Sequence, residues 1–596
     1  MSVAAPQTPR TPLPVGEIQV NFCKNPTCAN FARPANTTPQ PRGRPTSETQ
    51  RDHYAISGTS DGPQLRCLAC KEFIPIKSNA GIAEEIERLS RFLKPLSAPS
   101  CPNKDCDNCG ITVEAEPARY WAFGKTNAGT PRFRCKACKR TFSGTGPATK
   151  RQRKSHVNSE LFRALMLKMP VRCAAEFARI STPTVYDKID FIHRQCLAFA
   201  AARERRLMAM SYPRAYVCVD RMDHIINWTN RADKRNVVIQ AVGSANLKSG
   251  YVYGMHANYD SNVSSGPIAL DAVAVGDHLL QPPHRKYARF WLPAEYEKAM
   301  LLCKGNPPDP GKMGSLEEWI EGVYEEAISR GDVERPDPPR EDRKPPKRGL
   351  LVHAEYTLYA HFFYLKRLLA GAQKVRFFMD QESGIRAACL CAFWEQILAK
   401  DCDAFYVSIR KNIGKEKKLA MVKAAKKGLQ EFAERNGYDI LHEKEQRRLY
   451  IKERMRGLKE HGKWRDRWLD YPFPNMSEPE KRVCYLTNLN AHQFDYNEDH
   501  MANLFLMATL HPIDRFFMQL RRKNSMLERP IESSSNIGRK WYGYSPYDPA
   551  NAVKIMEIYR VYYNYVKVGD DGKTPAMRLG LAKGPCSVED ILYYVP

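Results

Sequence analysis

Hydrophobic and polar residues in the middle of the chain first follow the two-residue period of strands and then alternate between strand and helix patterns. Three β-rich runs, at 216–220, 236–243 and 250–256, are separated by turn residues, as in an antiparallel meander. Helical patterns follow at 356–369 and 385–400, and short apolar strands at 374–380 and 403–409. The order β-β-β-α-β-α-β predicts a mixed α/β sheet.

A mainly helical region precedes this sheet, from residue 158 to about 210. Within it, amphipathic runs at 171–180 and 183–194 flank Ser181-Thr182, which is the spacing of a helix-turn-helix, although an ordinary helical hairpin has the same pattern. Ser181 or Thr182 could cap a helix that begins with Pro183. Val185, Ile189 and Ile192 would pack inward. The residues expected to be exposed and able to reach DNA are Thr184, Tyr186, Lys188 and Arg194.

The second half of the chain contains longer irregular and charged stretches. A Pro-rich interval covers 306–349, a charged helical pattern covers 415–460, and an amphipathic helix is expected at 501–522. Between the last two, Trp464 and Trp468 could stack on an unpaired base, but core packing is the favoured interpretation.

The cysteines of the N-terminal region occur in two similar copies. Cys23-x4-Cys28 and Cys67-x2-Cys70 form the first copy, and Cys101-x4-Cys106 and Cys135-x2-Cys138 form the second. Both copies also share an aromatic residue, a Gly-rich turn and the pattern R-C-x-A-C-K. Four thiolates in two short-spaced pairs suit tetrahedral zinc, so we predict two structural Zn(II) sites in tandem zinc ribbons. Cys109 is an alternative to Cys106 as a zinc ligand of the second copy. Cys106 is preferred because the first copy has an equivalent cysteine at Cys28.

The charge of the chain favours a polyanionic partner. The 92 Lys and Arg residues outnumber the 66 Asp and Glu residues, which gives a net charge of +26. A basic run just after the second cysteine copy, formed by Lys150, Arg151, Arg153 and Lys154, adds candidate phosphate contacts. No signal-like segment and no long apolar run occur, so we expect neither secretion nor membrane insertion, but a reducing, cytoplasmic location.

Three acidic residues lie where a sheet could bring them together. Asp220 and Asp380 each end an apolar strand, and Glu528 lies in a helical pattern. Each of these acids alone could be only a turn or cap residue. If adjacent central strands carry the two aspartates, the crowded carboxylates would need divalent cations to neutralise them. Asp223 is an alternative to Asp220 as the first acid, but Asp220 is preferred because it closes the apolar strand. Glu532 is an alternative to Glu528 as the third acid, and the neighbouring Asn524 and Arg529 favour Glu528.

Together these motifs resemble the DDE transposases of bacterial insertion sequences, in which a zinc ribbon and a helix-turn-helix precede an RNase H-like catalytic domain. The resemblance is carried by CPNKDC and RFRCKACKRTFS in the second ribbon, VCVD at Asp220, FFMD at Asp380, NSMLER at Glu528 and TPAMRLGLAKGP near the C-terminus. This chain differs from the compact family pattern in having an extra ribbon and long intervals between the three acids.

The resemblance implies an enzyme that binds the terminal repeats of its element and cuts and joins DNA. Asp220, Asp380 and Glu528 would hold two Mg(II) or Mn(II) ions at the scissile phosphate. The expected partners are double-stranded DNA and further copies of the chain, as a homodimer or higher oligomer, in the bacterial nucleoid. The alternatives are a catalytically inactive, domesticated DNA-binding protein of transposase origin and an RNase H-like nuclease that acts on another substrate.

The expected fold is multidomain α/β. Its predicted parts are a disordered tail (1–19), zinc ribbon 1 (20–80), zinc ribbon 2 (98–148), a helix-turn-helix (155–210), a first catalytic part (211–411) with an insertion or linker (258–349), a helical insertion (412–499), and a second catalytic part with the C-terminal tail (500–596).

Overall fold

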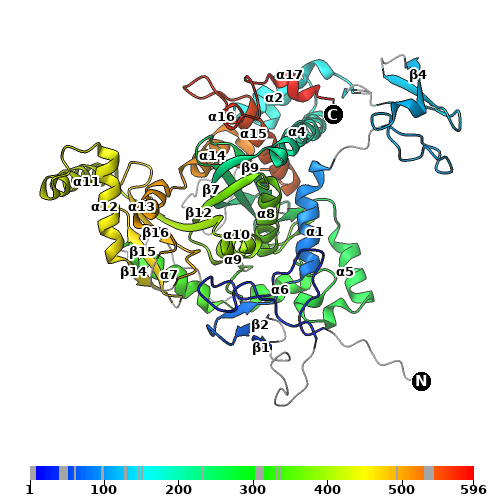
Figure 1. The fold of residues 1–596 in the computed structure, drawn as a ribbon. Coiled ribbons are helices and arrows are strands. Elements are labelled where there is room, and N and C mark those ends of the chain that lie inside the picture. The colour runs from blue at the N-terminus through cyan, green and yellow to red at the C-terminus, as the bar shows by residue number, and fades with distance from the viewer. Residues whose placement is uncertain are drawn as a thin grey trace, which may run out of the picture.

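The computed structural model describes most of the chain (Figure 1). The described residues are 9–38, 52–59, 62–94, 99–126, 130–144, 148–149, 152–230, 232–302, 315–330, 332–335, 339–462, 464–490, 494–528 and 543–595. In the described part, no helix is long and apolar enough to cross a membrane.

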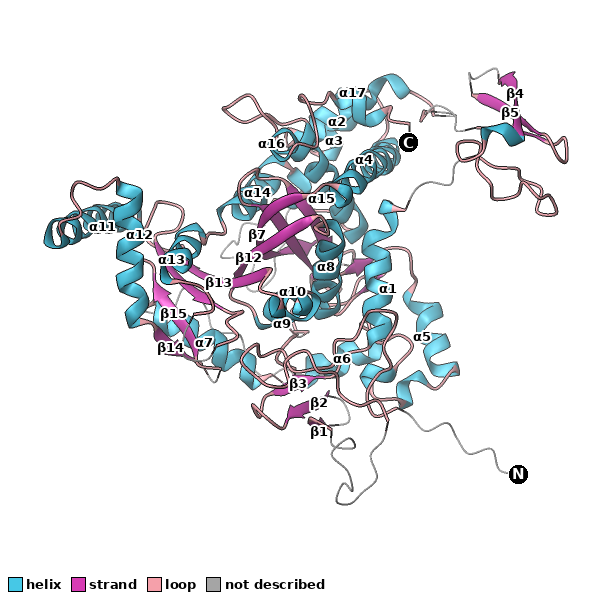
Figure 2. Cartoon of the chain, in the orientation of Figure 1, coloured by secondary structure: helices cyan, strands magenta, loops and turns pink. Residues whose placement is uncertain are grey.

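A mixed eight-stranded sheet forms the centre of the molecule, with the order β14-β15-β16-β13-β12-β7-β8-β9 (Figure 2). Its strands are β7 (Tyr212–Ile226), β8 (Val237–Asn246), β9 (Val252–Ala257), β12 (Ala372–Asp380), β13 (Cys402–Arg410), β14 (Lys459–His461), β15 (Asp466–Asp470) and β16 (Glu480–Tyr485). The antiparallel meander β7-β8-β9 and the parallel strands β12 and β13 confirm the strand order expected from the sequence.

Strand β12 lies between two parallel neighbours, β7 and β13. Phe377, Phe378 and Met379 are fully buried, because a strand covered on both faces places every side chain in the core. Val219 of β7 is the register partner of Met379, so the next residues, Asp220 and Asp380, lie side by side.

Helices cover both faces of the sheet. The main ones are α4 (Thr182–Ala209), α8 (Ala354–Leu368), α9 (Ser383–Ala392), α10 (Trp394–Leu398), α13 (Glu498–Met507), α14 (His511–Lys523) and α15 (Pro549–Tyr565). Gly243 of β8 allows α14 to approach closely, because a Cβ there would lie 2.7 Å from the Phe517 ring. Gly243 is also the register partner of Asp220, so α14 covers the face on which Asp220 lies.

The two cysteine-rich segments form separate three-stranded antiparallel sheets. The first consists of β1 (Tyr54–Thr59), β2 (Gly62–Cys67) and β3 (Phe73–Pro75), and the second of β4 (Tyr120–Lys125), β5 (Pro131–Cys135) and β6 (Thr141–Ser143). In Figure 2 the first lies against the main body, followed by α1 (Asn79–Ser90), whereas the second stands apart. We call them ribbon 1 and ribbon 2.

The insertion at 412–499 is only partly helical, which corrects the expectation. Helices α11 (Lys415–Asn436) and α12 (Glu443–Arg454) form a protrusion at the left of Figure 1, but β14, β15 and β16 then extend the central sheet beyond β13. These strands are short and carry charges paired with distant residues, such as Arg482 with Glu317 at 3.1 Å. Their polar sequences therefore conceal the two-residue period.

The expected linker at 258–349 contains structure that contributes to the core. It includes α5 (Ser265–Ala274), α6 (Pro293–Leu302) and α7 (Leu316–Ser329), and Ile320 and Tyr324 of α7 are buried. The Tyr324 hydroxyl donates to Asp466 of β15 at 2.6 Å. Through α7, residues 258–349 thus pack against β15, one of the strands that extend the central sheet beyond β13.

The expected disordered tail is ordered from residue 9 onward. Thr11 is fully buried, and the Asn79 side-chain amide donates to the carbonyls of Pro12 and Leu13 at 3.0 and 2.9 Å. The Pro-rich composition suggested disorder, but these backbone carbonyls find partners at the start of α1. Residues 1–8 of the expected tail lie outside the described residues.

Candidate functional site

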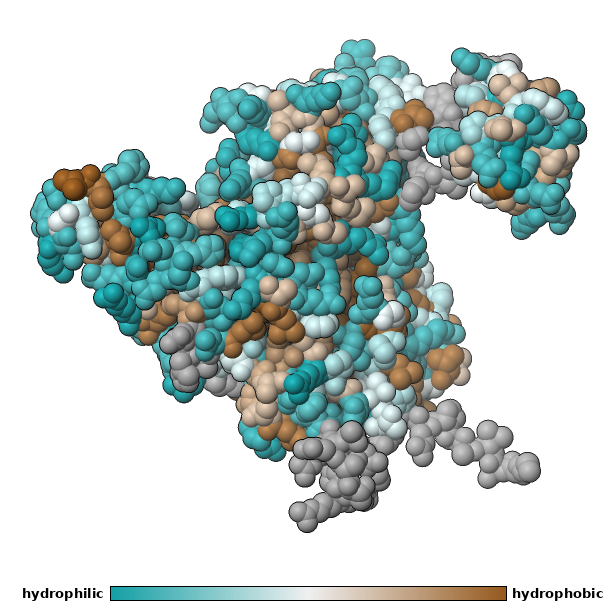
Figure 3. Space-filling view, in the orientation of Figure 1, coloured by the Kyte–Doolittle hydropathy of each residue, from teal (hydrophilic) through white to brown (hydrophobic). Residues whose placement is uncertain are grey.

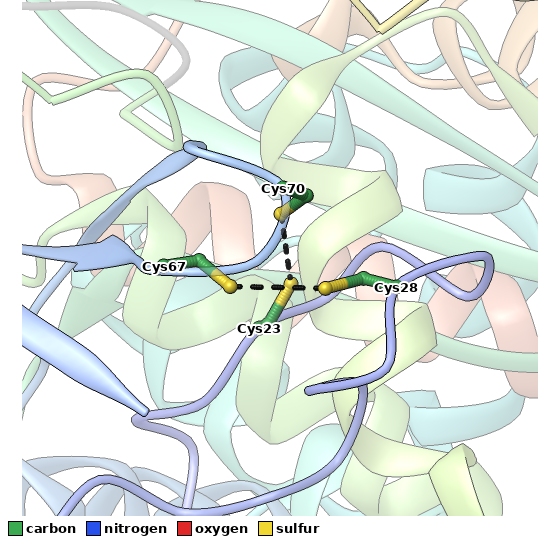
Figure 4. A group of neighbouring side chains, drawn as sticks. All are labelled: Cys23, Cys28, Cys67 and Cys70. Carbon is green, nitrogen blue, oxygen red and sulfur yellow. Dashed lines mark hydrogen bonds between the residues drawn. The ribbon is translucent and has the colours of Figure 1, made fainter. Parts of the chain in front are cut away.

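Each ribbon brings four cysteine sulfurs together. Within each set the Sγ atoms lie within 4.8 Å of one another. Figure 4 shows the first set, Cys23, Cys28, Cys67 and Cys70, and the second consists of Cys101, Cys106, Cys135 and Cys138. The Sγ–Sγ distances include 3.5 Å for Cys23–Cys70 and 3.3 Å for Cys101–Cys138. A tetrahedral zinc site with Zn–S bonds of 2.3 Å places its sulfurs about 3.8 Å apart, so both sets could hold a structural zinc ion.

The second set contains Cys106 and not Cys109. Cys109 is exposed and does not belong to the group of four, which agrees with the preference for Cys106. In ribbon 1, the hydrogen bond between Cys70 and Cys23 lowers the pKa of the Cys70 thiol to about 5, so this sulfur is readily available as a thiolate ligand.

Both ribbons share polar residues around the sulfurs that sequence reasoning missed. Asn30 donates to the Cys67 sulfur at 3.4 Å, and Asn108 donates to the Cys135 sulfur at 3.2 Å. Each asparagine is the second residue after the second cysteine of its copy, so the repeated Cys-x-Asn was the available signal. N–H groups aimed at thiolate sulfurs orient them and stabilise their charge.

A cleft of about 940 Å³ lies at the edge of the central sheet, beside α14. Its walls include acidic and basic side chains in comparable number. Among the lining residues are Asp220, Lys411, Asp514, Arg515, Arg521 and Glu528. Mixed charges in a hollow of this size suit a polyanion accompanied by cations.

Asp220 and Asp380 lie next to each other on the central parallel strands β7 and β12. Burial and the neighbouring carboxylate of Asp380 raise the pKa of Asp220 well above its usual value. Burial also raises the pKa of Asp380 to about 6, even though Lys411 opposes the rise. Two carboxylates held together in this way favour a proton or a cation between them.

Lys411, directly after β13, supplies a positive charge at this point. Its ammonium nitrogen lies 2.6 Å from both carboxylate oxygens of Asp514, in the first turn of α14. Burial would lower the pKa of Lys411, but Asp514, Asp220 and Asp380 outweigh it, and the pKa is raised. Asp514 is thus a third acid coupled to the aspartate pair, which the sequence analysis did not identify.

Glu528 lies on the wall of the same cleft, where its Oε1 accepts from the Lys168 ammonium group at 2.8 Å. Asn524, in the same motif, donates to the Leu520 carbonyl at 2.8 Å at the end of α14. Within the described part of the chain, no three carboxylates of the cleft have oxygens within 4.8 Å of one another. Arg529 and Glu532 lie outside the described residues.

The helix-turn-helix candidate consists of α3 (Val171–Phe177) and α4. The Ser181 hydroxyl accepts from the Thr184 backbone N–H at 3.4 Å, so Ser181, and not Thr182, caps α4. Val185, Ile189 and Ile192 are buried, as their spacing predicts.

Lys188 is not on the exposed face, which corrects the expectation. Its side chain is only 2% exposed, and its ammonium nitrogen donates to the carbonyls of Arg153 and Lys154, both at 2.9 Å. A lysine can be buried in this way when backbone oxygens satisfy its charge. Lys188 therefore ties α4 to the basic run and is unavailable to DNA.

The other residues proposed to contact DNA differ in exposure. Arg153, Lys154 and Arg194 are exposed, whereas Thr184 and Tyr186 are half-buried. Lys150 and Arg151 lie outside the described residues.

The tryptophan pair belongs to the packed interior, as favoured. Trp468 is 1% exposed, stacks on Tyr406 with ring centroids 6.0 Å apart, and donates to the Tyr324 hydroxyl at 3.2 Å. Trp464 packs against the same core, with its ring 5.6 Å from that of Tyr324.

Comparison of the sequence with protein-family models and with curated proteins finds no match in either.

Proposed function

We propose that the chain is a DNA transposase that cuts and joins DNA with divalent metal ions held in the cleft beside α14. The single observation that carries this proposal is the placement of Asp220, which lines the charged cleft, beside Asp380 on the adjacent central strand. In this reading the central sheet belongs to an RNase H-like catalytic domain. The strand order β9-β8-β7-β12-β13 supports that assignment.

The aspartate pair fits a divalent cation. Both carboxylates have raised pKa values, which means that their anionic forms lack sufficient compensating charge. When bound, Mg(II) or Mn(II) would act as a Lewis acid toward the scissile phosphate and its attacking oxygen. Asp220 and Asp380 would be the first ligands, with a third acid completing the set.

The remaining side chains of the cleft would bind and orient the DNA backbone. Arg515 and Arg521 of α14 line the cleft and would contact phosphates on either side of the reacting one. Lys411 would hold Asp514 and contribute positive charge near the developing negative charge. The helix-turn-helix, through Arg194 and its capped N-terminus, would bind the terminal repeats as duplex DNA.

Two residues compete for the position of the third acid. The motif NSMLER favours Glu528, whereas the electrostatic coupling to the aspartate pair favours Asp514. In our proposal Glu528 is the ligand, and it must leave Lys168 when metal and DNA enter. Asp514 then remains paired with Lys411 and positions that lysine.

A pair of isosteric variants separates these roles. Glu528→Gln should reduce DNA strand cleavage by orders of magnitude at saturating Mg(II), while Asp514→Asn should retain measurable cleavage. Duplex DNA binding by both proteins is the control and should match the wild type. If Asp514→Asn abolishes cleavage and Glu528→Gln does not, Asp514 is the third ligand.

A further inference from the structure

Ribbon 2 carries an exposed face of aromatic and basic residues. Trp121 and Phe123 of β4 are each 43% exposed. Although β4 has a register shift after Ala122, the register partner of Trp121, Arg134 of β5, also lies 5.7 Å from the Phe123 ring, so the two rings share one face. In the space-filling view the surface of this ribbon is mostly hydrophilic, with a few apolar residues among the hydrophilic ones (Figure 3).

Cations lie over both aromatic rings. The Lys139 ammonium nitrogen is 4.6 Å from the Trp121 ring centroid, and the Arg132 guanidinium is 5.4 Å from that of Phe123. Lys136 and Arg134 lie slightly further from the same two rings, at 5.9 and 5.7 Å. The face therefore offers two flat apolar surfaces surrounded by four positive charges.

The same positions in ribbon 1 carry different residues. Aligning Tyr54 with Tyr120 places Ala55 and Ser57 of ribbon 1 where ribbon 2 has Trp121 and Phe123. The duplicated fold thus forms without the two aromatic rings. They are not needed to build a ribbon, and their exposure on ribbon 2 calls for another reason.

Ribbon 1 is instead anchored to the body of the molecule by buried charges. The Lys24 ammonium nitrogen lies 2.6 Å from Glu334, and that of Lys77 lies 3.3 Å from Glu355. Burial alone would lower the pKa of Lys77, but the nearby carboxylates outweigh it and raise the pKa. Ribbon 1 uses its lysines for docking, whereas ribbon 2 presents its cations on the surface.

We propose that this face of ribbon 2 binds unpaired DNA, with bases stacked on Trp121 and Phe123 and phosphates held by the surrounding Lys and Arg side chains. Two aromatic rings on one face of the ribbon can each take one base of an extended single strand. Stacking requires the flat face of a base, which a duplex hides, and the cations complement the DNA backbone. The inference rests on the proposed function in taking DNA as the substrate, and it assigns single-strand contact to one ribbon only.

The test replaces the two aromatic residues with those that ribbon 1 uses. Full-length protein carrying Trp121→Ala and Phe123→Ser is compared with the wild type by fluorescence anisotropy, on labelled oligo-dT of about 16 nucleotides. A duplex of the same length is measured at the same salt concentration. The matched control is Ile56→Ala with Leu68→Ala, which removes two exposed apolar side chains, each 45% exposed, from ribbon 1. Zinc content shows that the ribbons remain folded.

The Kd of the double variant for oligo-dT should rise by about tenfold or more, the size expected for lost base stacking. Its Kd for duplex DNA and both Kd values of the ribbon 1 control should stay within about twofold of wild type. Unchanged binding of oligo-dT by the variant, an equal loss for duplex DNA, or no binding of oligo-dT by the wild type would each overturn the inference. None of these results depends on catalysis, so a failed cleavage assay would contradict the proposed function and leave this test intact.

Discussion

Removing the charge of Asp380 should stabilise the metal-free protein. In most buried acids, Asp→Asn removes a favourable ion pair, but Asp380 lies beside Asp220, and burial raises its pKa from 3.8 to about 6. The folded protein therefore holds a proton on Asp380 more tightly than the unfolded chain does. Stability falls as the pH rises from about 4 to above 6, because the folded state must then bury a charge that the unfolded state exposes to water.

The size of the effect follows from the same pKa. A rise in the pKa of Asp380 from 3.8 to about 6 on folding corresponds to about 3 kcal/mol of stability, which is lost at pH 8 and mostly regained at pH 4. Asp380→Asn removes this cost. Since 1 kcal/mol changes the melting temperature of a large domain by about 2 °C, the variant should melt up to about 6 °C higher at pH 8.

Thermal melting in EDTA at pH 8 and pH 4 measures this difference, with Mg(II) added in a further set at pH 8. The melting temperature of Asp380→Asn should exceed that of the wild type at pH 8 but not at pH 4. Mg(II) should raise the melting temperature of the wild type and not that of the variant, because a ligand stabilises the state that binds it.

The matched control is Asp403→Asn on the adjacent strand β13. Asp403 lies 2.9 Å from the buried Arg376 guanidinium, so its replacement leaves a buried charge unpaired and should destabilise by about 3–5 kcal/mol at pH 8. Burial raises the pKa of Asp403 above its usual value, so the loss should be smaller at pH 4. If Asp380→Asn also lowers the melting temperature at pH 8 in EDTA, burial of the Asp380 carboxylate does not cost the folded protein stability as argued.

Two further predictions concern the ribbons. Cys135→Ser should reduce the zinc content from two ions per chain to one, because the sets of four sulfurs are separate; elemental analysis that finds both ions lost, or none, would contradict two independent sites. Lys77→Met should leave the buried Glu355 with only the more distant Arg335, at 3.8 Å, and weaken the docking of ribbon 1 by up to about 3–5 kcal/mol, which limited proteolysis would detect as faster cleavage between ribbon 1 and the body. Lys94→Met, in an exposed pair with Glu87, should be cleaved like the wild type, and equal rates for all three proteins would show that the buried charges do not anchor the ribbon.

The core of the sheet could be predicted because its strands are buried on both faces. The apolar runs at 374–380 and 403–409 match β12 and β13 to within two residues at either end. Strands buried in this way have long hydrophobic stretches that are hard to mistake. The same reasoning failed for β14 to β16, whose charged residues are buried with partners far away in sequence, as Arg386 is with Asp466 at 2.7 Å.

The cleft could be predicted only in part. An aspartate that closes an apolar run is visible in the sequence, so Asp220 and Asp380 could be proposed and their adjacency expected. Asp380 ends β12 as predicted, but Asp220 does not end its strand, because β7 continues to Ile226. Asp514 lies in the first turn of α14. An acidic residue at this position is usually explained by its favourable interaction with the helix N-terminus, so the sequence gives no reason to assign it to the cleft. Its coupling to Asp220 and Asp380, and its ion pair with Lys411 more than 100 positions earlier in the chain, arise only in the folded structure.

The helix-turn-helix shows a different limit of sequence reasoning. An amphipathic pattern assigns every charged residue to the exposed face, yet Lys188 is buried because two backbone carbonyls face it. The positions of those carbonyls are set by tertiary structure, so only the buried apolar residues of α4 were predictable from periodicity.

DNA strand cleavage by the full-length protein tests the central claim most directly. The substrate is a labelled duplex containing the sequence that flanks the gene of this protein, incubated with Mg(II) and analysed on a denaturing gel. The account predicts cleavage by the wild type and by Asp223→Asn, whose side chain pairs with Arg221 at 3.1 Å, and a loss of orders of magnitude for Asp220→Asn with duplex binding retained. Cleavage by Asp220→Asn at the wild-type rate would contradict it.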